Sequence, residues 1–407
     1  MPLSCVLFTI GIISMQIYPS VGLLLPSLKQ PLVFICVLFA GLAQFIYFTF
    51  ENGKKNFNKN TMIYYFGMLF SIICMVFISL YNSGIGKSNY HSYTTIVDIV
   101  SMAMYTSGII FTAKNSRMYT YKILLVLGAI GVVNGTLAIF SGDFTAFDRS
   151  NTWTNSYILW FSLFPWLALL VFSLFKLKQL SLLEKVITYF STLLYLVLGM
   201  LFLKRIVLFE LLLIVFVTGF AQGYGRFFKR GFIILIFSTI FLYIGDSLLD
   251  LNIMKYFELT INRFNEFDTV GGFNRVEEFT VGLSGFGLLD YLFGVGFGGL
   301  HFGFGDPRGN MHIAWANYLF KGGAVLMLIQ FYGLTSSIKS FFKARESNNR
   351  NKLASSSVVI IWFISALINT FWGASAITML LSMMLFSALT FNRNDELLLF
   401  RHRRFIY

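Results

Sequence analysis

The stretch that decides the fold runs from Val186 to Gln222 and reads VITYFSTLLYLVLGMLFLKRIVLFELLLIVFVTGFAQ. These 37 residues are apolar almost throughout and carry charge only at Lys204, Arg205 and Glu210. A membrane-spanning helix needs about 20 mostly apolar residues, so the stretch is too long for one span and right for two. It therefore predicts two helices that cross a membrane and turn at Lys204-Arg205.

The composition of the whole chain predicts an all-α polytopic membrane protein. Of its 407 residues, 57% are hydrophobic and only 12% are charged, whereas a soluble globular protein carries about a quarter charged residues. The mean hydropathy is +0.72. We expect one integral membrane domain, 1–407, with about 12 transmembrane helices. The predicted segments are 3–24, 31–50, 61–81, 93–113, 122–141, 156–175, 186–203, 206–222, 231–249, 311–336, 354–372 and 374–392.

The positive charges indicate how the chain crosses the membrane. The net charge of +13 could suggest a nucleic-acid partner, but the cations gather in short loops between apolar segments, as the positive-inside rule requires. Six alternate loops, including the C-terminal tail, hold 21 of the 31 lysines and arginines. These loops are therefore expected in the cytoplasm together with both termini. A large loop, 246–310, is then expected on the outer face.

The outer segment from Gly245 to Gly323 contains two unusual features. The run from Val281 to Phe293 is apolar but is broken by glycines and Asp290, which favours an interfacial or re-entrant helix over a full span. The next run, GVGFGG from Gly294 to Gly299, follows no strand and predicts a tight backbone turn, not a dinucleotide-binding loop.

Three cations near the outer face are candidate anion ligands. Lys204 and Arg205 fall at an outer turn, where the positive-inside rule disfavours cations. They either snorkel to lipid headgroups or form an anion site. Arg275 precedes the glycine-broken helix and either pairs with nearby glutamates or binds the same anion. The planar guanidinium of arginine suits a phosphate because it donates two parallel hydrogen bonds.

The histidines and the acidic residues inside spans are the remaining candidates. His312 begins a helix at the predicted boundary between water and lipid, and it is either a general base or a boundary residue without a chemical role. His301 is a weaker candidate. Asp98 and Glu210 lie inside spans, and we expect them to be hydrogen-bonded within the bundle rather than part of a proton path. We expect no metal, because no cluster of metal ligands is visible in the sequence, and we expect no cofactor.

Taken together, these features resemble the family of bacterial O-antigen polymerases and ligases, the Wzy-type and WaaL-type membrane glycosyltransferases of the GT-C class. The overall layout is similar, with about a dozen helices and a large periplasmic loop late in the chain. The local matches are Lys204-Arg205 at a periplasmic turn, Arg275 leading to Gly294-Val295-Gly296, and His312 followed by Trp315 and Gly323. The chain departs from the family pattern at Ile313, where Asn is frequent, and at Lys321, where an acidic or polar residue is common.

The resemblance implies a metal-independent glycosyltransferase in the bacterial inner membrane. Its substrates would be glycans linked to undecaprenyl diphosphate, and a protein that regulates chain length would be a further partner. Arg205 and Arg275, assisted by Lys204, would bind the diphosphate, and His312 would be the general base. A polymerase is preferred over a ligase that transfers polymer to the lipid A core. A polysaccharide flippase and a membrane scaffold without catalytic activity remain alternatives.

Overall fold

The structure is a computed structural model of the whole chain. It describes residues 1–51, 57–84, 92–141, 164–175, 180–201, 205–223, 225, 258, 272–301, 311, 313–367 and 375–390. The predicted span 231–249 and most of the predicted loop 246–310 before Gly272 lie outside these residues.

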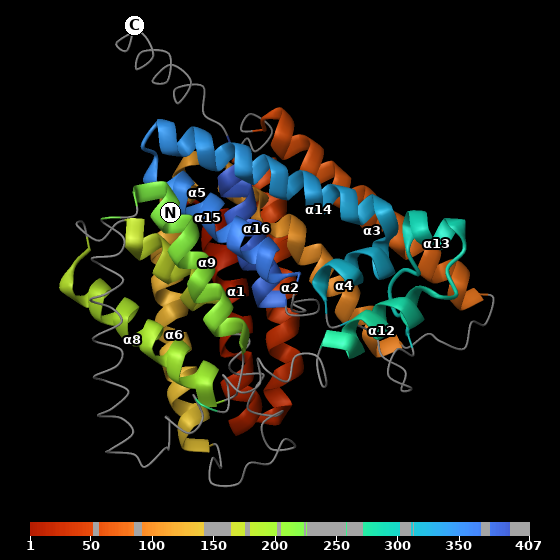
Figure 1. Cartoon of the computed structure of the whole chain (residues 1–407), viewed down its shortest axis with the longest axis horizontal. Coiled ribbons are helices and arrows are strands. Elements are labelled where there is room, and N and C mark those ends of the chain that lie inside the picture. Colours follow the sequence, from red (N-terminus) through yellow and green to blue (C-terminus); the bar gives the residue numbers. More distant parts are fainter. Residues whose placement is uncertain are drawn as a thin grey trace, which may run out of the picture.

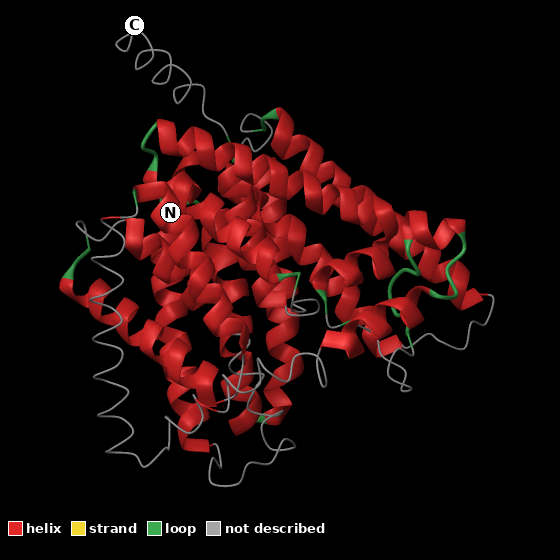
Figure 2. Cartoon of the chain, viewed as in Figure 1, coloured by secondary structure: helices red, strands yellow, loops and turns green. Residues whose placement is uncertain are grey.

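The described residues form a bundle of helices and contain no strands (Figures 1 and 2). A further helix without a label, Phe164–Phe175, lies between α6 and α8 in the sequence. The labelled elements are α1 (Leu3–Leu24), η1 (Pro26–Leu28), α2 (Lys29–Thr49), α3 (Lys59–Gly84), α4 (Ser92–Ser107), η3 (Gly108–Thr112), α5 (Lys114–Arg117), α6 (Thr120–Ser141), α8 (Leu182–Leu201), α9 (Arg205–Gln222), α12 (Gly272–Leu283), α13 (Leu288–Phe293), α14 (Ala314–Glu346), α15 (Arg350–Ser365) and α16 (Ser375–Leu389).

The all-α prediction is confirmed for these residues, and the structure adds details that the apolar pattern did not contain. Helix α1 has the predicted bounds, and the run Val186–Gln222 is divided into α8 and α9. The segment 93–113 changes from α-helix to 3-10 helix at Gly108. Helix α14 continues ten residues past the predicted end at 336, to Glu346. Its last turns carry Lys343 and Arg345, so a prediction from hydropathy alone placed the end of the helix too early.

Among the residues that the structure describes, four helices are long and apolar enough to cross a membrane: Gln30–Thr49, Lys59–Gly84, Lys114–Leu137 and Ala314–Glu346. Shorter apolar helices accompany them at Leu3–Tyr18, Phe164–Phe175, Ile206–Gln222 and Ile377–Leu389. A chain of several membrane-spanning helices is consistent with this arrangement. The count of twelve stays a prediction.

Helix α3 shows the two faces expected of a helix at the surface of a membrane bundle. Phe66, Phe70 and Phe77 recur at helical spacing and are 52–67% exposed. The opposite face carries buried residues that include Met68 and Met75. Large aromatic side chains at this exposure form an apolar surface that water would disfavour, so this side of α3 suits contact with lipid.

The core of the bundle is helix α16. Its residues from Ile377 to Leu389 are all buried, and α1, α3, α4, η3, α14 and α15 pack around it. Figure 1 shows α16 in the middle of the bundle. A helix that has no charged residue and is mostly apolar on every side has no face suited to water, so it is enclosed by its neighbours.

The break between α4 and η3 allows close packing against α16. The Ser382 hydroxyl donates to the Tyr105 carbonyl oxygen at 2.6 Å and accepts from the Gly108 N–H at 2.8 Å. A Cβ atom on Gly108 would overlap the backbone of Ser382 and Met383. Small residues of this kind let helix backbones approach closely inside a membrane.

This contact predicts different effects for two Gly→Ala substitutions. Gly108→Ala should destabilise the protein by about 1–3 kcal/mol, because the added methyl group has no room. Gly41→Ala in α2 is the matched control, since a Cβ atom there meets nothing within 4 Å. It should be neutral or stabilising by about 0.5–1 kcal/mol. The check is the midpoint of thermal unfolding in detergent. Equal midpoints for both variants would contradict the packing described here.

Candidate functional site

The glycine run after α13 is the part of the outer segment that the structure describes in most detail. Gly294, Gly296 and Gly298 have φ values of 74°, 80° and 77°. L-residues with a side chain rarely adopt this left-handed region. The alternation of glycine with Val295 and Phe297 therefore produces the tight turn that the sequence predicted, and it lets the backbone lie directly against the bundle.

Helix α14 is interrupted where this run packs against it. Gly323 has φ 61° and ψ −164°, outside the helical region. A Cβ atom on Gly323 would overlap the backbone of Leu292 and Phe293. The interruption leaves carbonyl groups that need partners. Those of Phe320 and Lys321 accept hydrogen bonds from the N–H groups of Val295 and Gly296, at 2.9 and 3.0 Å.

A buried ion pair joins the same run to α4. The Lys321 ammonium lies 2.8 Å from Oδ2 of Asp98, and both side chains are 0% exposed. Lys321 Nζ also donates to the Gly299 carbonyl oxygen at 2.8 Å, and the Gly298 N–H donates to Asp98 Oδ2 at 3.4 Å. Each charge thus has both its counter-ion and a backbone partner in the glycine run, which a buried charge requires.

Helix α3 is the third helix that contacts the glycine run, after α14 and α4. The Ser79 hydroxyl accepts from the Phe297 N–H at 2.6 Å, and the Asn82 side chain donates to the Val295 carbonyl oxygen at 3.1 Å. A Cβ atom on Gly296 would lie 2.6 Å from Ser79 Oγ. The run is therefore held by polar contacts from α3, α4 and α14 together.

Helix α12 is attached to this assembly through a second buried pair. His301 Nε2 lies 3.6 Å from Oε1 of Glu278, and both side chains are buried. The His301 ring also packs edge-on against Phe320 of α14, with ring centroids 5.5 Å apart. An apolar cluster of Leu283, Met311, Ala316 and Phe320 packs beside it. His301, the weaker candidate, thus links α12 to the glycine run and α14.

Asn317 fixes the chain as it enters α14. Its side chain accepts from the Met311 N–H at 2.7 Å and donates to the Met311 carbonyl oxygen at 2.6 Å. The two bonds hold Met311 against the first turn of α14. No role was predicted for Asn317 from the sequence.

The predicted catalytic residues are described only in part. Arg275 belongs to α12 and Arg205 is the first residue of α9, but the side chains of both lie outside the described residues, as do Lys204 and His312. Figure 1 shows α9 beside α8, and α12 beside α13 on another side of the bundle. The described residues do not bring the two arginine-bearing helices together, so a shared anion site stays a prediction.

The two acidic residues inside spans behave as expected. Asp98 is paired with Lys321, and Glu210 accepts a short hydrogen bond from the Tyr195 hydroxyl. The prediction that both are bonded within the bundle is confirmed. That Lys321 is the partner of Asp98 was not predicted. A single lysine in one apolar segment and a single aspartate in another could have indicated such a pair.

Within the described ranges, no three His, Cys, Asp or Glu residues come together as a metal site. Comparisons with protein-family models and with curated proteins found no match to the chain.

The buried ion pair predicts a non-additive pair of substitutions. Asp98→Leu or Lys321→Met alone should destabilise the protein by about 3–5 kcal/mol, because each leaves one uncompensated buried charge. The double variant leaves none and should be less destabilised than either single variant. The measurement is a double-mutant cycle on thermal unfolding midpoints. Lys339→Met, which removes an exposed cation from the same helix, is the control and should have little effect. Additive effects of the two substitutions would show that the charges do not interact.

Proposed function

We propose that this protein is a membrane glycosyltransferase that polymerises oligosaccharide repeat units linked to undecaprenyl diphosphate. In this proposal the chain has twelve spans, both termini are cytoplasmic, and the reaction occurs on the periplasmic face of a bacterial inner membrane. The residue matches at Lys204-Arg205, Arg275 and His312 motivate the proposal. The product would be O-antigen or a similar surface polysaccharide.

The observation that supports this proposal best is that the described part of the outer segment is anchored to the helix bundle. The glycine run is held against α3, α4 and α14 by hydrogen bonds and by the buried pair Asp98–Lys321. Helix α12 is joined to the chain just after this run by the buried pair Glu278–His301. A transferase needs its catalytic groups held in a fixed geometry above the membrane. Arg275 lies on the anchored helix α12. The chain neighbours of His312 are held too, since Met311 is bound by Asn317 and Ile313 packs against the apolar cluster.

The proposed reaction is a displacement at the anomeric carbon of the lipid-linked glycan. An acceptor hydroxyl oxygen attacks that carbon, a new glycosidic C–O bond forms, and the bond from the carbon to the diphosphate breaks. The electron pair leaves with the diphosphate oxygen, where Arg205, Arg275 and Lys204 stabilise the developing charge. The hydroxyl proton passes to His312, the general base.

The first test is the glycan pattern of a deletion strain complemented with variants. Arg205→Ala or Arg275→Ala should reduce polymer formation by about 10²–10³-fold, as expected for removal of a group that stabilises the leaving oxygen. His312→Ala should cost about 10²–10⁴-fold. Arg350→Ala, an exposed arginine at the start of α15, is the matched control and should retain wild-type chain lengths. Membrane levels of each variant are measured in parallel.

The deletion strain also separates the alternatives. A single repeat unit on the acceptor indicates a polymerase, and accumulation of lipid-linked polymer indicates a ligase. Lipid-linked single units retained on the cytoplasmic face indicate a flippase. Glycan chains of wild-type length from both arginine variants would rule out the assigned anion site. Full activity of His312→Ala would rule out His312 as the general base.

A further inference from the structure

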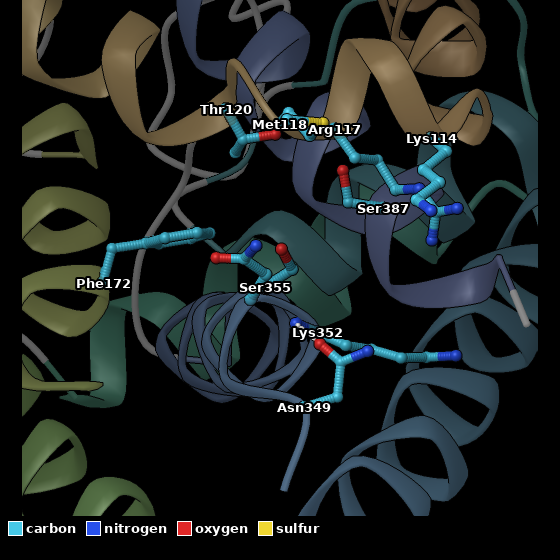
Figure 3. Close-up of a pocket in the computed structure, with 10 residues that line it drawn as sticks. Lys114, Arg117, Met118, Thr120, Phe172, Asn349, Lys352, Ser355 and Ser387 are labelled. Atoms are coloured by element: carbon cyan, nitrogen blue, oxygen red, sulfur yellow. Dashed lines mark hydrogen bonds between the residues drawn. The ribbon is translucent and has the colours of Figure 1, made fainter. Parts of the chain in front are cut away.

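A cavity of about 260 Å³ lies away from the outer segment, where α5 meets the start of α15 and the end of α16 (Figure 3). The loops that border it are among those expected in the cytoplasm. Because a water molecule occupies about 30 Å³ of liquid volume, the cavity has room for a phosphate group with part of its substituent. Its lining residues are Lys114, Arg117, Met118, Thr120, Phe172, Asn349, Asn351, Lys352, Ser355 and Ser387.

All the charged residues that line this cavity are cations. Lys114, Arg117 and Lys352 line it, and none of the ten lining residues is acidic. Figure 3 shows Lys114 and Arg117 extending from the α5 segment and Lys352 at the first turn of α15. Lys352 is only 5% exposed, and its ammonium is fixed by a 2.7 Å bond to the Thr390 carbonyl oxygen.

The N-terminus of α15 opens on the same cavity. The N-cap residue Asn349 lines the space together with Asn351 and Lys352 of the first turn, and the Asn349 side chain accepts from the Lys352 N–H at 3.2 Å. A 16-residue helix carries partial positive charge at this end. The helix end therefore adds to the attraction of the three cations for an anion.

Two hydroxyl groups in the wall give the second, independent indication of a ligand. Thr120 and Ser387 are 3% and 4% exposed, and neither hydroxyl has a hydrogen-bond partner among the described residues. Figure 3 shows the Ser387 hydroxyl pointing toward the Arg117 side of the cavity. Buried hydroxyls are almost always bonded, so hydroxyls without a protein partner in the wall of this cavity are available to donate to the oxygen atoms of a bound ligand.

The positive-inside rule alone does not explain this arrangement. That rule places cations in cytoplasmic loops, where they are free to remain in water. It does not require a lysine to be buried and fixed, nor two buried hydroxyls to face the same space. We propose that this cavity binds a phosphate group, either of a soluble phosphate compound or of an anionic lipid of the inner leaflet. This site is separate from the outer segment, and its existence does not depend on glycosyl transfer.

The test uses the purified full-length protein and two probes. The first probe is inorganic phosphate added in detergent, compared with sodium chloride at equal ionic strength. The second is reconstitution into vesicles of phosphatidylcholine with or without phosphatidic acid. Phosphate, but not chloride, should raise the thermal unfolding midpoint in a saturable manner. A shift with phosphatidic acid vesicles and none with inorganic phosphate would assign the site to a lipid headgroup.

Two variants make the result specific. Ser387→Ala removes an unpartnered hydroxyl without changing charge, so the midpoint without phosphate should not fall, while the Kd for phosphate should rise about tenfold. Arg117→Gln should weaken binding at least as much. Lys339→Gln, an exposed cation outside the cavity, is the control and should leave the Kd unchanged. The proposal is overturned if neither probe shifts the midpoint, or if both cavity variants respond as the wild type does.

Discussion

The arrangement of the described outer segment depends on one interaction, the buried pair of Asp98 and Lys321. A charge away from water needs a counter-ion and further hydrogen bonds, and here the additional partners are Gly298 and Gly299 of the glycine run. The pair can therefore form fully only when α4, α14 and that run are together. Removing one partner of such a pair is costly, whereas replacing both with apolar residues often costs little stability. The pair therefore disfavours arrangements in which only one of its two helices is in place.

The pair also explains the unusual backbone around it. Lys321 stands two residues before the interruption at Gly323, and its carbonyl oxygen receives the Gly296 N–H while its ammonium binds Asp98. A regular helix would use that carbonyl for its own bonding. The interruption of α14 and the left-handed glycines thus belong together: helix α14 loses hydrogen bonds of its own, and N–H groups of the glycine run bond the freed carbonyl groups.

The apolar pattern predicted most of the helices well, because span length and hydrophobicity are properties of single segments. It did not predict the change at Gly108, which follows from the position of Ser382 in a helix far along the chain. The bonding of Asp98 and Glu210 within the bundle was predictable because an isolated carboxylate in lipid is costly. The partner Lys321, the Asn317 contact and the basic cavity each depend on distant segments meeting, which no local pattern records.

The separation of these partners along the chain has a consequence for biosynthesis. Tyr105 and Tyr318, which are hydrogen-bonded between the same two helices, are 213 residues apart. At about 5–20 residues per second, α4 is made roughly 10–40 s before α14. During that interval Asp98 has no Lys321 to meet, and for most of it the glycine run has not been made. Helix α4 must therefore wait without the partner of its carboxylate, and final assembly of the bundle is a late event.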